Sequence, residues 1–107
     1  MADIDVTEAH RRWAAGDLVI IDCREEQEHE ATRVDGVPLI PMSEFLARVD
    51  ELPEGTPLAI LCRSGARSAQ VADYLTATGE HGDVANVAGG IIAWAAEGLP
   101  YEGDPPR

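Results

Sequence analysis

Short apolar runs alternate along this chain with longer segments in which apolar residues recur at helical spacing, and this alternation limits the folds available to it. Three runs of four or five residues are interpreted as buried strands: Leu18 to Asp22, Leu58 to Cys62 and Val84 to Val87. A further short strand is predicted near Ile4 to Val6. Strands separated by amphipathic helices are typical of a parallel sheet covered on both faces. The pattern therefore predicts an α/β fold, a three-layer α/β/α sandwich with a mainly parallel central sheet of about five strands.

Helix boundary signals fill the intervals between these runs. Ser and Thr favour the N-cap position, and Gly favours the left-handed residue that follows a helix. On these signals, helices are predicted to begin at Thr7 and Ser43 and to end at Gly16, Gly79 and Gly98. The charged segment from Glu25 to Ala31 is predicted to be a solvated helix. A short edge strand fits Val37 to Ile40, because Gly36 and Pro41 forbid a longer regular element there.

The length of 107 residues suits one domain, and 45% of the residues are hydrophobic. A domain of this size buries roughly 60 to 70% of the surface that its unfolded chain exposes, which is enough to fold without a disulfide or a structural metal. We therefore expect a single domain over residues 1–107, of which residues 99–107 form a short Pro-containing tail.

Acidic residues outnumber basic ones by 20 to 8, which gives a formal net charge of −12. Such a charge repels nucleic-acid phosphates and anionic lipids, so neither is an expected partner. Residues 1–6 lack the basic and apolar regions of a secretory signal, and no apolar run is long enough to span a bilayer. These features predict a cytoplasmic protein without a membrane segment.

The chain has two cysteines, Cys23 and Cys62, whose spacing fits neither a disulfide framework nor a zinc site. Both are expected to be reduced thiols. The three histidines, His10, His29 and His81, also lack ligand spacing. No metal and no cofactor is therefore predicted.

Cys62 stands where a predicted buried strand runs into a loop and then into a helix. Open α/β sheets bind ligands beyond the carboxyl ends of their strands, so this junction is the expected site. The loop reads Arg63-Ser64-Gly65-Ala66-Arg67-Ser68. Its backbone N–H groups can converge on an anion, the following helix adds its positive end, and Arg63 and Arg67 lie close in sequence. These surroundings predict a lowered pKa for the Cys62 thiol and a nucleophilic thiolate near neutral pH.

Residues 62–68, Cys-Arg-Ser-Gly-Ala-Arg-Ser, resemble the active-site loop of the rhodanese family, and the similarity extends over nearly the whole chain. Ile21-Asp22-Cys23-Arg24-Glu25 resembles the family's Asp-x-Arg segment, and residues 86–94 resemble its Gly-Gly-x-x-x-Trp ending. The family's Gly-His-Ile stretch is degenerate here, with Thr32-Arg33-Val34 in its place, and Leu39 replaces an Asn. This departure leaves the predicted fold intact but changes the expected wall of the site.

The resemblance implies a sulfurtransferase that works by double displacement. Cys62 would take the sulfane sulfur of a small anionic donor such as thiosulfate and hold it as a persulfide. The sulfur would then pass to an acceptor thiol, to a sulfur-carrier protein, or to cyanide in an assay. Backbone N–H groups of residues 63–68 would hold the persulfide anion, while Arg63 and Arg67 would orient the donor's oxyanion end. Asp22 and Arg24 would brace this edge of the site, or simply end the strand.

Two other functions stay open on the sequence. A related phosphatase or arsenate reductase needs five residues between its Cys and its Arg, whereas four separate Cys62 from Arg67, and Ser68 stands in the Arg position. A partner-dedicated or non-enzymatic rhodanese module would relay sulfur to one partner or regulate it. A tight partner together with negligible thiosulfate turnover would indicate that module.

Cys23 follows Asp22 at the same edge of the predicted sheet as Cys62, which permits a resolving or redox-sensing role. Packing between the sheet and the helices is the favoured interpretation, because residues at this strand end usually point into that layer.

Overall fold

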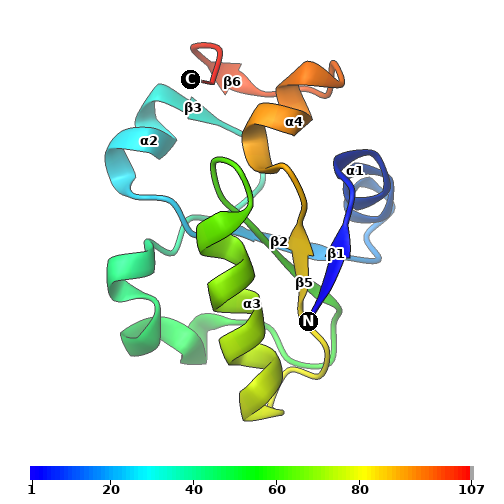
Figure 1. The fold of residues 1–107 in the computed structure, drawn as a ribbon, viewed down its shortest axis with the longest axis vertical. Coiled ribbons are helices and arrows are strands. Elements are labelled where there is room, and N and C mark those ends of the chain that lie inside the picture. Colours follow the sequence, from blue (N-terminus) through cyan, green and yellow to red (C-terminus); the bar gives the residue numbers. More distant parts are fainter. Residues whose placement is uncertain (107) are drawn as a thin grey trace.

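A four-stranded parallel sheet lies at the centre of the computed structural model, which describes residues 1–106 (Figure 1). Its neighbouring strands all pair in parallel, in the order β1-β5-β4-β2. The strands are β1 (Ala2–Ile4), β2 (Val19–Asp22), β4 (Leu58–Leu61) and β5 (Ala85–Val87). This arrangement confirms the α/β prediction, since the three apolar runs interpreted as buried strands supply β2, β4 and β5. The short strand predicted near Ile4 to Val6 lies earlier, at Ala2–Ile4, because Val6 already begins a helix, α1 (Val6–Ala14).

The additional strand predicted at Val37 to Ile40 is reduced to a single bridge to Asp22. The Ile40 N–H donates to the Asp22 carbonyl and the Asp22 N–H donates to the Pro38 carbonyl, each at 2.9 Å. Pro38 has no N–H to extend the ladder on one side. On the other side, the Arg24 N–H donates to the Asp22 carboxylate at 2.9 Å instead of to a neighbouring strand. The expectation of about five strands was therefore too high, and the sheet has four.

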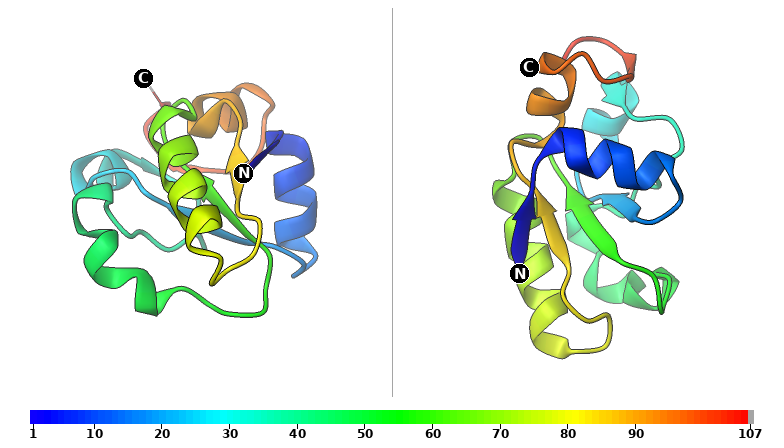
Figure 2. Two further views of the ribbon diagram at one scale, coloured as in Figure 1. Left: turned by 60° about the horizontal axis from the view of Figure 1, so that its bottom comes forward. Right: turned by 90° about the vertical axis from the view of Figure 1, so that its right-hand side faces the viewer.

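Helices cover the two faces of the sheet as separate layers (Figure 2). One face carries α1 (Val6–Ala14) and α4 (Gly90–Ala96), and the other carries α3 (Ala66–Thr78) with the 3-10 helices η1 (Met42–Glu44) and η2 (Leu46–Glu51). Along β4, Ile60 points into the α3 layer, whereas Ala59 and Leu61 point into the other. The predicted three-layer sandwich is confirmed.

Two helix starts differ from the prediction. α1 begins before the predicted N-cap Thr7, because the Asp5 carboxylate accepts the Glu8 N–H at 2.8 Å and takes the N-cap position. The helix predicted to begin at Ser43 is replaced by η1 and η2. The Ser43 hydroxyl donates to the Glu25 carboxylate at 2.7 Å, so it does not cap a helix.

A two-stranded antiparallel ribbon joins the tail to the middle of the chain. In this ribbon, β3 (Thr32–Arg33) pairs with β6 (Glu102–Gly103). The helix α2 (Glu26–Ala31) directly precedes β3. The Asp104 N–H donates to the Ala31 carbonyl at 2.7 Å, and the Thr32 hydroxyl donates to the Asp104 carbonyl at 2.6 Å. The segment expected to be only a tail therefore packs along α2 and β3. Arg107, the last residue of that predicted tail, lies outside the described residues.

The longest helix, α3, has 13 residues. Within residues 1–106, no helix combines the length and the apolar character needed to cross a membrane.

Candidate active site

The loop that follows β4 carries Cys62 and enters α3 through Gly65, which has a φ of +102° that favours glycine. This loop rests on the start of α4, where the Ile91 N–H donates to the Cys62 carbonyl at 2.9 Å. Gly90 makes the approach possible, because a Cβ at that position would lie 2.4 Å from the Arg63 carbonyl oxygen. This close contact accounts for a glycine at the first position of α4.

Donors from the loop and from the first turn of α3 surround the Cys62 sulfur. The Gly65 N–H lies 3.1 Å from Sγ and the Ser68 N–H lies 3.4 Å from it. The Ser68 hydroxyl oxygen is 3.2 Å from the same atom. Ser64 and Ala66 are exposed on the outside of the turn. The backbone thus forms a partial cage that favours negative charge on the sulfur.

Hydrogen bonds decide the ionisation of Cys62. The Cys23 thiol donates to the Cys62 sulfur, and this bond, with those from Ser68 and Gly65, lowers the pKa of Cys62 to about 4 against the opposing effect of burial. The same bond and burial raise the pKa of Cys23, so that thiol keeps its proton. Cys62 is therefore a thiolate at neutral pH. Its main stabilisation comes from Cys23, which the sequence analysis favoured as a packing residue.

The arginines of the loop differ in their contacts. Arg67 donates to both oxygens of the Glu28 carboxylate, at 2.6 and 2.7 Å. The pairing raises the pKa of Arg67 and lowers the pKa of Glu28. Arg63 extends from the exposed part of the loop and lines a neighbouring cavity. Arg67 is thus paired with Glu28 in this structure, and the expectation that Arg63 and Arg67 orient an anionic donor stays a prediction.

Asp22 and Arg24 form an ion pair at the end of β2, where they are 1% and 3% exposed. The Arg24 guanidinium donates to the Asp22 carboxylate at 2.8 to 3.1 Å and to the Thr32 carbonyl at 2.6 Å. It also reaches the Glu28 carbonyl at 3.3 Å. The pair therefore fastens the end of β2 to α2 and β3, so it does more than end a strand.

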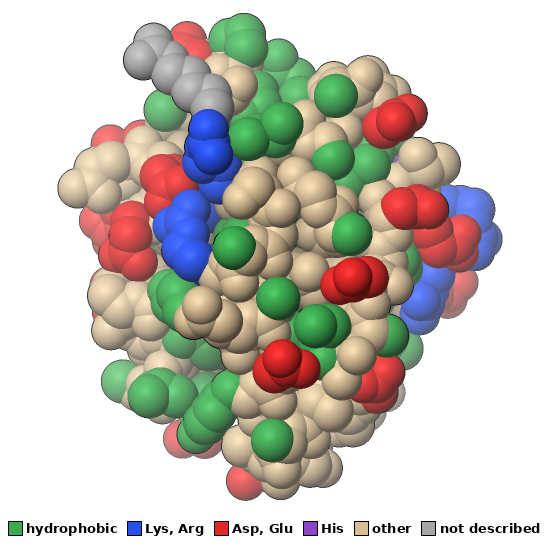
Figure 3. All heavy atoms as spheres, viewed as in Figure 1, with side chains coloured by type: hydrophobic (Ala, Val, Ile, Leu, Met, Phe, Trp, Pro, Cys, Tyr) green, Lys and Arg blue, Asp and Glu red, His purple; other side chains and the backbone are tan. Residues whose placement is uncertain are grey.

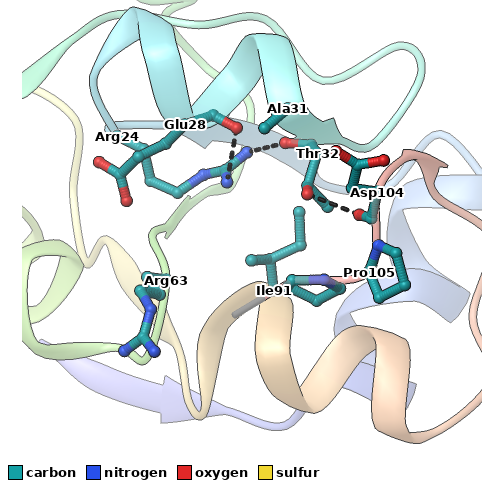
Figure 4. A pocket seen from close by; sticks show the side chains of 9 residues that line it. Arg24, Glu28, Ala31, Thr32, Arg63, Ile91, Asp104 and Pro105 are labelled. Carbon is teal, nitrogen blue, oxygen red and sulfur yellow. Dashed lines mark hydrogen bonds between the residues drawn. The ribbon is translucent and has the colours of Figure 1, made fainter.

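A cavity of about 380 Å³ opens beside the loop (Figure 4). It is lined by Arg24, Glu28, Ala31, Thr32, Arg63, Ile91 and residues 104–106. Arg63 lies across the cavity from Arg24 (Figure 4). The volume suits a small molecule. The face shown in Figure 3 has cationic side chains beside α2 and the loop before α3, with carboxylates next to them, so the local charge is mixed.

The Cys62 sulfur is closed off from solvent in this structure, because the residue is only 1% exposed. Two residues that line the cavity are its immediate neighbours: Arg63 follows it in the chain, and the Ile91 N–H donates to its carbonyl. The Cys62 sulfur therefore lies behind the residues that line the cavity and is not itself part of the lining.

The structure adds polar side chains that the sequence analysis did not select. Ser68 Oγ lies 2.5 Å from Asn86 Oδ1, and Asn86 Nδ2 donates to Asp3 Oδ1 at 3.0 Å. Asn86 is buried on β5, next to β4. A polar residue inside an apolar strand was a usable signal for Asn86. Glu28 offered no such signal, because it belongs to a run of acidic residues.

Comparisons with known proteins agree on one family. The model of the Rhodanese-like domain matches residues 5–97. A protein named sulfurtransferase from Allochromatium vinosum is 38% identical over 99 residues, which cover 92% of this chain and 92% of that protein. The putative sulfur carrier protein YrkF of Bacillus subtilis is 36% identical over 80 residues, or 75% of this chain, and the match spans 43% of its length.

Among solved structures, the crystal structure of a rhodanese-related protein from Thermoplasma volcanium has a TM-score of 0.86 at 25% sequence identity. The match covers 97% of this chain and 100% of that one. The layers and the sheet therefore belong to a fold that this rhodanese-related protein shares.

Proposed function

The chain belongs to the rhodanese-like domain family, and we propose that it is a sulfurtransferase that carries sulfane sulfur on Cys62. Relatives named sulfurtransferases support a role in sulfur transfer. In this proposed reaction, thiosulfate or a similar small anion is the sulfur donor and a Cys62 persulfide is the intermediate. The acceptor is a thiol, or cyanide in an assay. The observation that carries this proposal is the group of donors aimed at one ionised sulfur.

The first half of the reaction loads the sulfur. The Cys62 thiolate attacks the outer sulfur of thiosulfate, the sulfur–sulfur bond of the donor breaks, and sulfite leaves with the bonding electron pair. A persulfide anion remains on Cys62. No general base is needed, because the thiol is already ionised at neutral pH.

The second half of the reaction transfers the sulfur from the Cys62 persulfide to the acceptor. An acceptor thiolate attacks the terminal sulfur, the bond between that sulfur and Sγ breaks, and the Cys62 thiolate is restored. The Gly65 and Ser68 N–H groups lie 3.1 and 3.4 Å from Sγ, so they favour the anion both before loading and after discharge.

Arg63 supports the choice of an anionic donor, because its side chain lines the cavity next to the loop. Asp22 and Arg24 act in this proposal as a brace, since their contacts are to each other, to α2 and to β3. Arg67 turns to Glu28 and Ser68 faces the sulfur, which supports sulfur transfer over phosphate-ester hydrolysis.

A small thiol or a sulfur-carrier protein is the proposed acceptor, and one relative is itself named a putative sulfur carrier protein. We place this exchange in the cytoplasm, where Cys23 and Cys62, both free thiols in the structure, stay reduced.

The test is the intact mass of the protein after incubation with thiosulfate and removal of the excess. We expect a gain of one sulfur atom in the wild-type chain, removed by cyanide and absent in Cys62→Ser. Cys23→Ser shows which thiol carries the sulfur: it removes the other thiol and should still gain the sulfur, at a lower rate because Cys23 contributes most to the low pKa of Cys62. Failure to gain sulfur from thiosulfate, mercaptopyruvate or a small persulfide would contradict the proposal.

A further inference from the structure

Cys23 stands beside Cys62 on the neighbouring strand. The register of β2 and β4 pairs Asp22 with Leu61, and the Cys23 N–H donates to the Leu61 carbonyl at 2.9 Å, so the ladder continues by one residue. Neighbouring strands lie about 4.8 Å apart. Disulfide-bonded cysteines have Cα atoms about 4.4 to 6.8 Å apart. The backbone thus already holds the two cysteines at a separation that a disulfide can bridge.

The two side chains also share one environment. Both belong to the cluster of buried residues between the sheet and α3, where Cys23 is 0% and Cys62 is 1% exposed. The neighbouring Cys23 thiol also lowers the pKa of Cys62. Register and burial therefore place the two thiols side by side in one buried cluster.

The transfer cycle proposed above does not use the sulfur of Cys23 as a nucleophile. An apolar side chain would fill this buried position equally well, without placing a second thiol against a reactive one. A thiol beside a persulfide has a specific chemistry, since it can displace the outer sulfur and form a disulfide.

We propose that Cys23 resolves the Cys62 persulfide within the same chain and releases the sulfur as hydrosulfide. The inference rests on the proposed function, because it needs the persulfide as its starting point. The Cys23 thiol gives its proton to the anionic outer sulfur, and the Cys23 thiolate formed in that transfer attacks Cys62 Sγ. The bond from Sγ to the outer sulfur breaks, the outer sulfur leaves as the hydrosulfide anion with that proton, and a Cys23–Cys62 disulfide remains.

Atoms and electrons balance in this step without an outside oxidant. The outer sulfur is reduced to hydrosulfide, and the Cys23 sulfur is oxidised to the disulfide level that Cys62 Sγ already has in the persulfide. A low-molecular-weight thiol then reduces the disulfide and restores the starting state. The loaded protein thus has two outcomes: transfer to an external acceptor, or release of hydrosulfide when none arrives.

The experiment follows a single turnover without added thiol. Wild-type and Cys23→Ser chains are loaded with thiosulfate under anaerobic conditions and desalted, and intact mass and free sulfide are followed over time. Ile21→Val, which alters the same buried cluster but leaves both thiols, is the control for packing. Peptide mapping of the products identifies any Cys23–Cys62 disulfide.

We expect all three chains to gain one sulfur, Cys23→Ser more slowly than the others because it lacks the thiol that contributes most to the low pKa of Cys62. Wild type and Ile21→Val should then lose that sulfur together with two hydrogens, release sulfide and yield the disulfide peptide, at a rate independent of protein concentration. Cys23→Ser should keep its persulfide, with sulfide release slower by at least about tenfold, because the neighbouring nucleophile is lost.

The possible failures are distinguishable. A wild-type persulfide that lasts as long as that of Cys23→Ser would overturn this inference and leave the sulfurtransferase proposal standing. A release rate that rises with protein concentration would also overturn it, because the attacking thiol would come from another molecule. Absence of loading in every chain would instead reject the proposed function. Should Cys23→Ser fail to fold, Cys23→Val takes its place in the comparison.

Discussion

At the scale of single residues, the Ser68 hydroxyl has one proton and two acceptors within reach. Its oxygen is 3.2 Å from Cys62 Sγ and 2.5 Å from Asn86 Oδ1. Asn86 Nδ2 donates to Asp3, which fixes Oδ1 toward Ser68. An anion is the stronger acceptor. The hydroxyl therefore turns to the sulfur when Cys62 is ionised and to Asn86 when Cys62 is protonated.

The low pKa of Cys62 predicts the pH dependence of its alkylation. A thiolate reacts and a thiol does not, so the rate should stay level from neutral pH downward and fall through its midpoint only at about pH 4. The measurement is the rate of carbamidomethylation at Cys62, followed by peptide mass after reaction with iodoacetamide. A small reagent suits a side chain that is 1% exposed. A midpoint near that of a free cysteine, at about pH 8.5, would contradict the assignment.

Removing the Ser68 hydroxyl tests one donor separately. Ser68→Ala should raise the midpoint of the same alkylation profile by about one pH unit, since a hydrogen bond to a charged group contributes roughly 1.5 to 3 kcal/mol and the backbone donors remain. Ser64→Ala, at an exposed position of the same loop, is the control and should leave the midpoint unchanged. Equal midpoints for wild type and Ser68→Ala would show that the hydroxyl serves only Asn86.

At the scale of elements, two ion pairs hold the segments around the loop, and their burial differs. The Arg67–Glu28 pair links α3 to α2 with both side chains about one third exposed, so solvent weakens it. The Asp22–Arg24 pair links β2 to β3 and is almost completely buried. A buried pair contributes little net stability when intact, but either member left alone is costly.

The buried pair predicts a contrast between a single and a double substitution. Arg24→Leu should lower the free energy of unfolding by about 3 to 5 kcal/mol, because it leaves the buried Asp22 carboxylate without its charged partner. Asp22→Leu combined with Arg24→Leu should recover a substantial part of that loss. Urea unfolding followed by circular dichroism measures both. Equal losses in the two variants would show that the backbone contacts of Arg24, and not its charge, account for the effect.

The elements that could be predicted from the sequence are those specified by local signals. The run from Leu58 gives β4, and the glycines on either side of α3 bound that helix. The helix predicted at Ser43 was wrong because its hydroxyl is used by Glu25, a contact 18 residues away that no local pattern encodes. The contact between Cys23 and Cys62 depends likewise on sheet register, so the sequence showed only that both lie at strand ends.

At the scale of the whole molecule, the β3–β6 ribbon closes the structure over one wall of the cavity. It could not be predicted, since each of its strands has two residues and the tail shows no apolar alternation. The residues after β6 line the cavity together with Arg63. The tail thereby takes part in shaping the site, whereas the sequence analysis gave it no role.

Gly103 offers a test of this closure. It has a φ of +89°, and a Cβ there would lie 2.2 Å from the Ala31 carbonyl oxygen, so Gly103→Ala should separate the ribbon. Gly55→Ala is the matched control, with a φ of +74° and open space around the added Cβ. Both changes carry the strain of a positive φ, about 1 kcal/mol. Only Gly103→Ala should speed amide exchange of Asp104 and raise KM for thiosulfate. Unchanged exchange at Asp104 would contradict the role given to the ribbon.

The burial of Cys62, which is 1% exposed, affects how long a sulfur atom transferred to it would stay there. Persulfides decay in water because oxygen, peroxides and stray thiols collide with them. A sulfur enclosed between a sheet and a helix is shielded from such molecules. The lifetime of the loaded state would then depend on the neighbouring Cys23 and on the intended acceptor, and not on chance collisions with solutes.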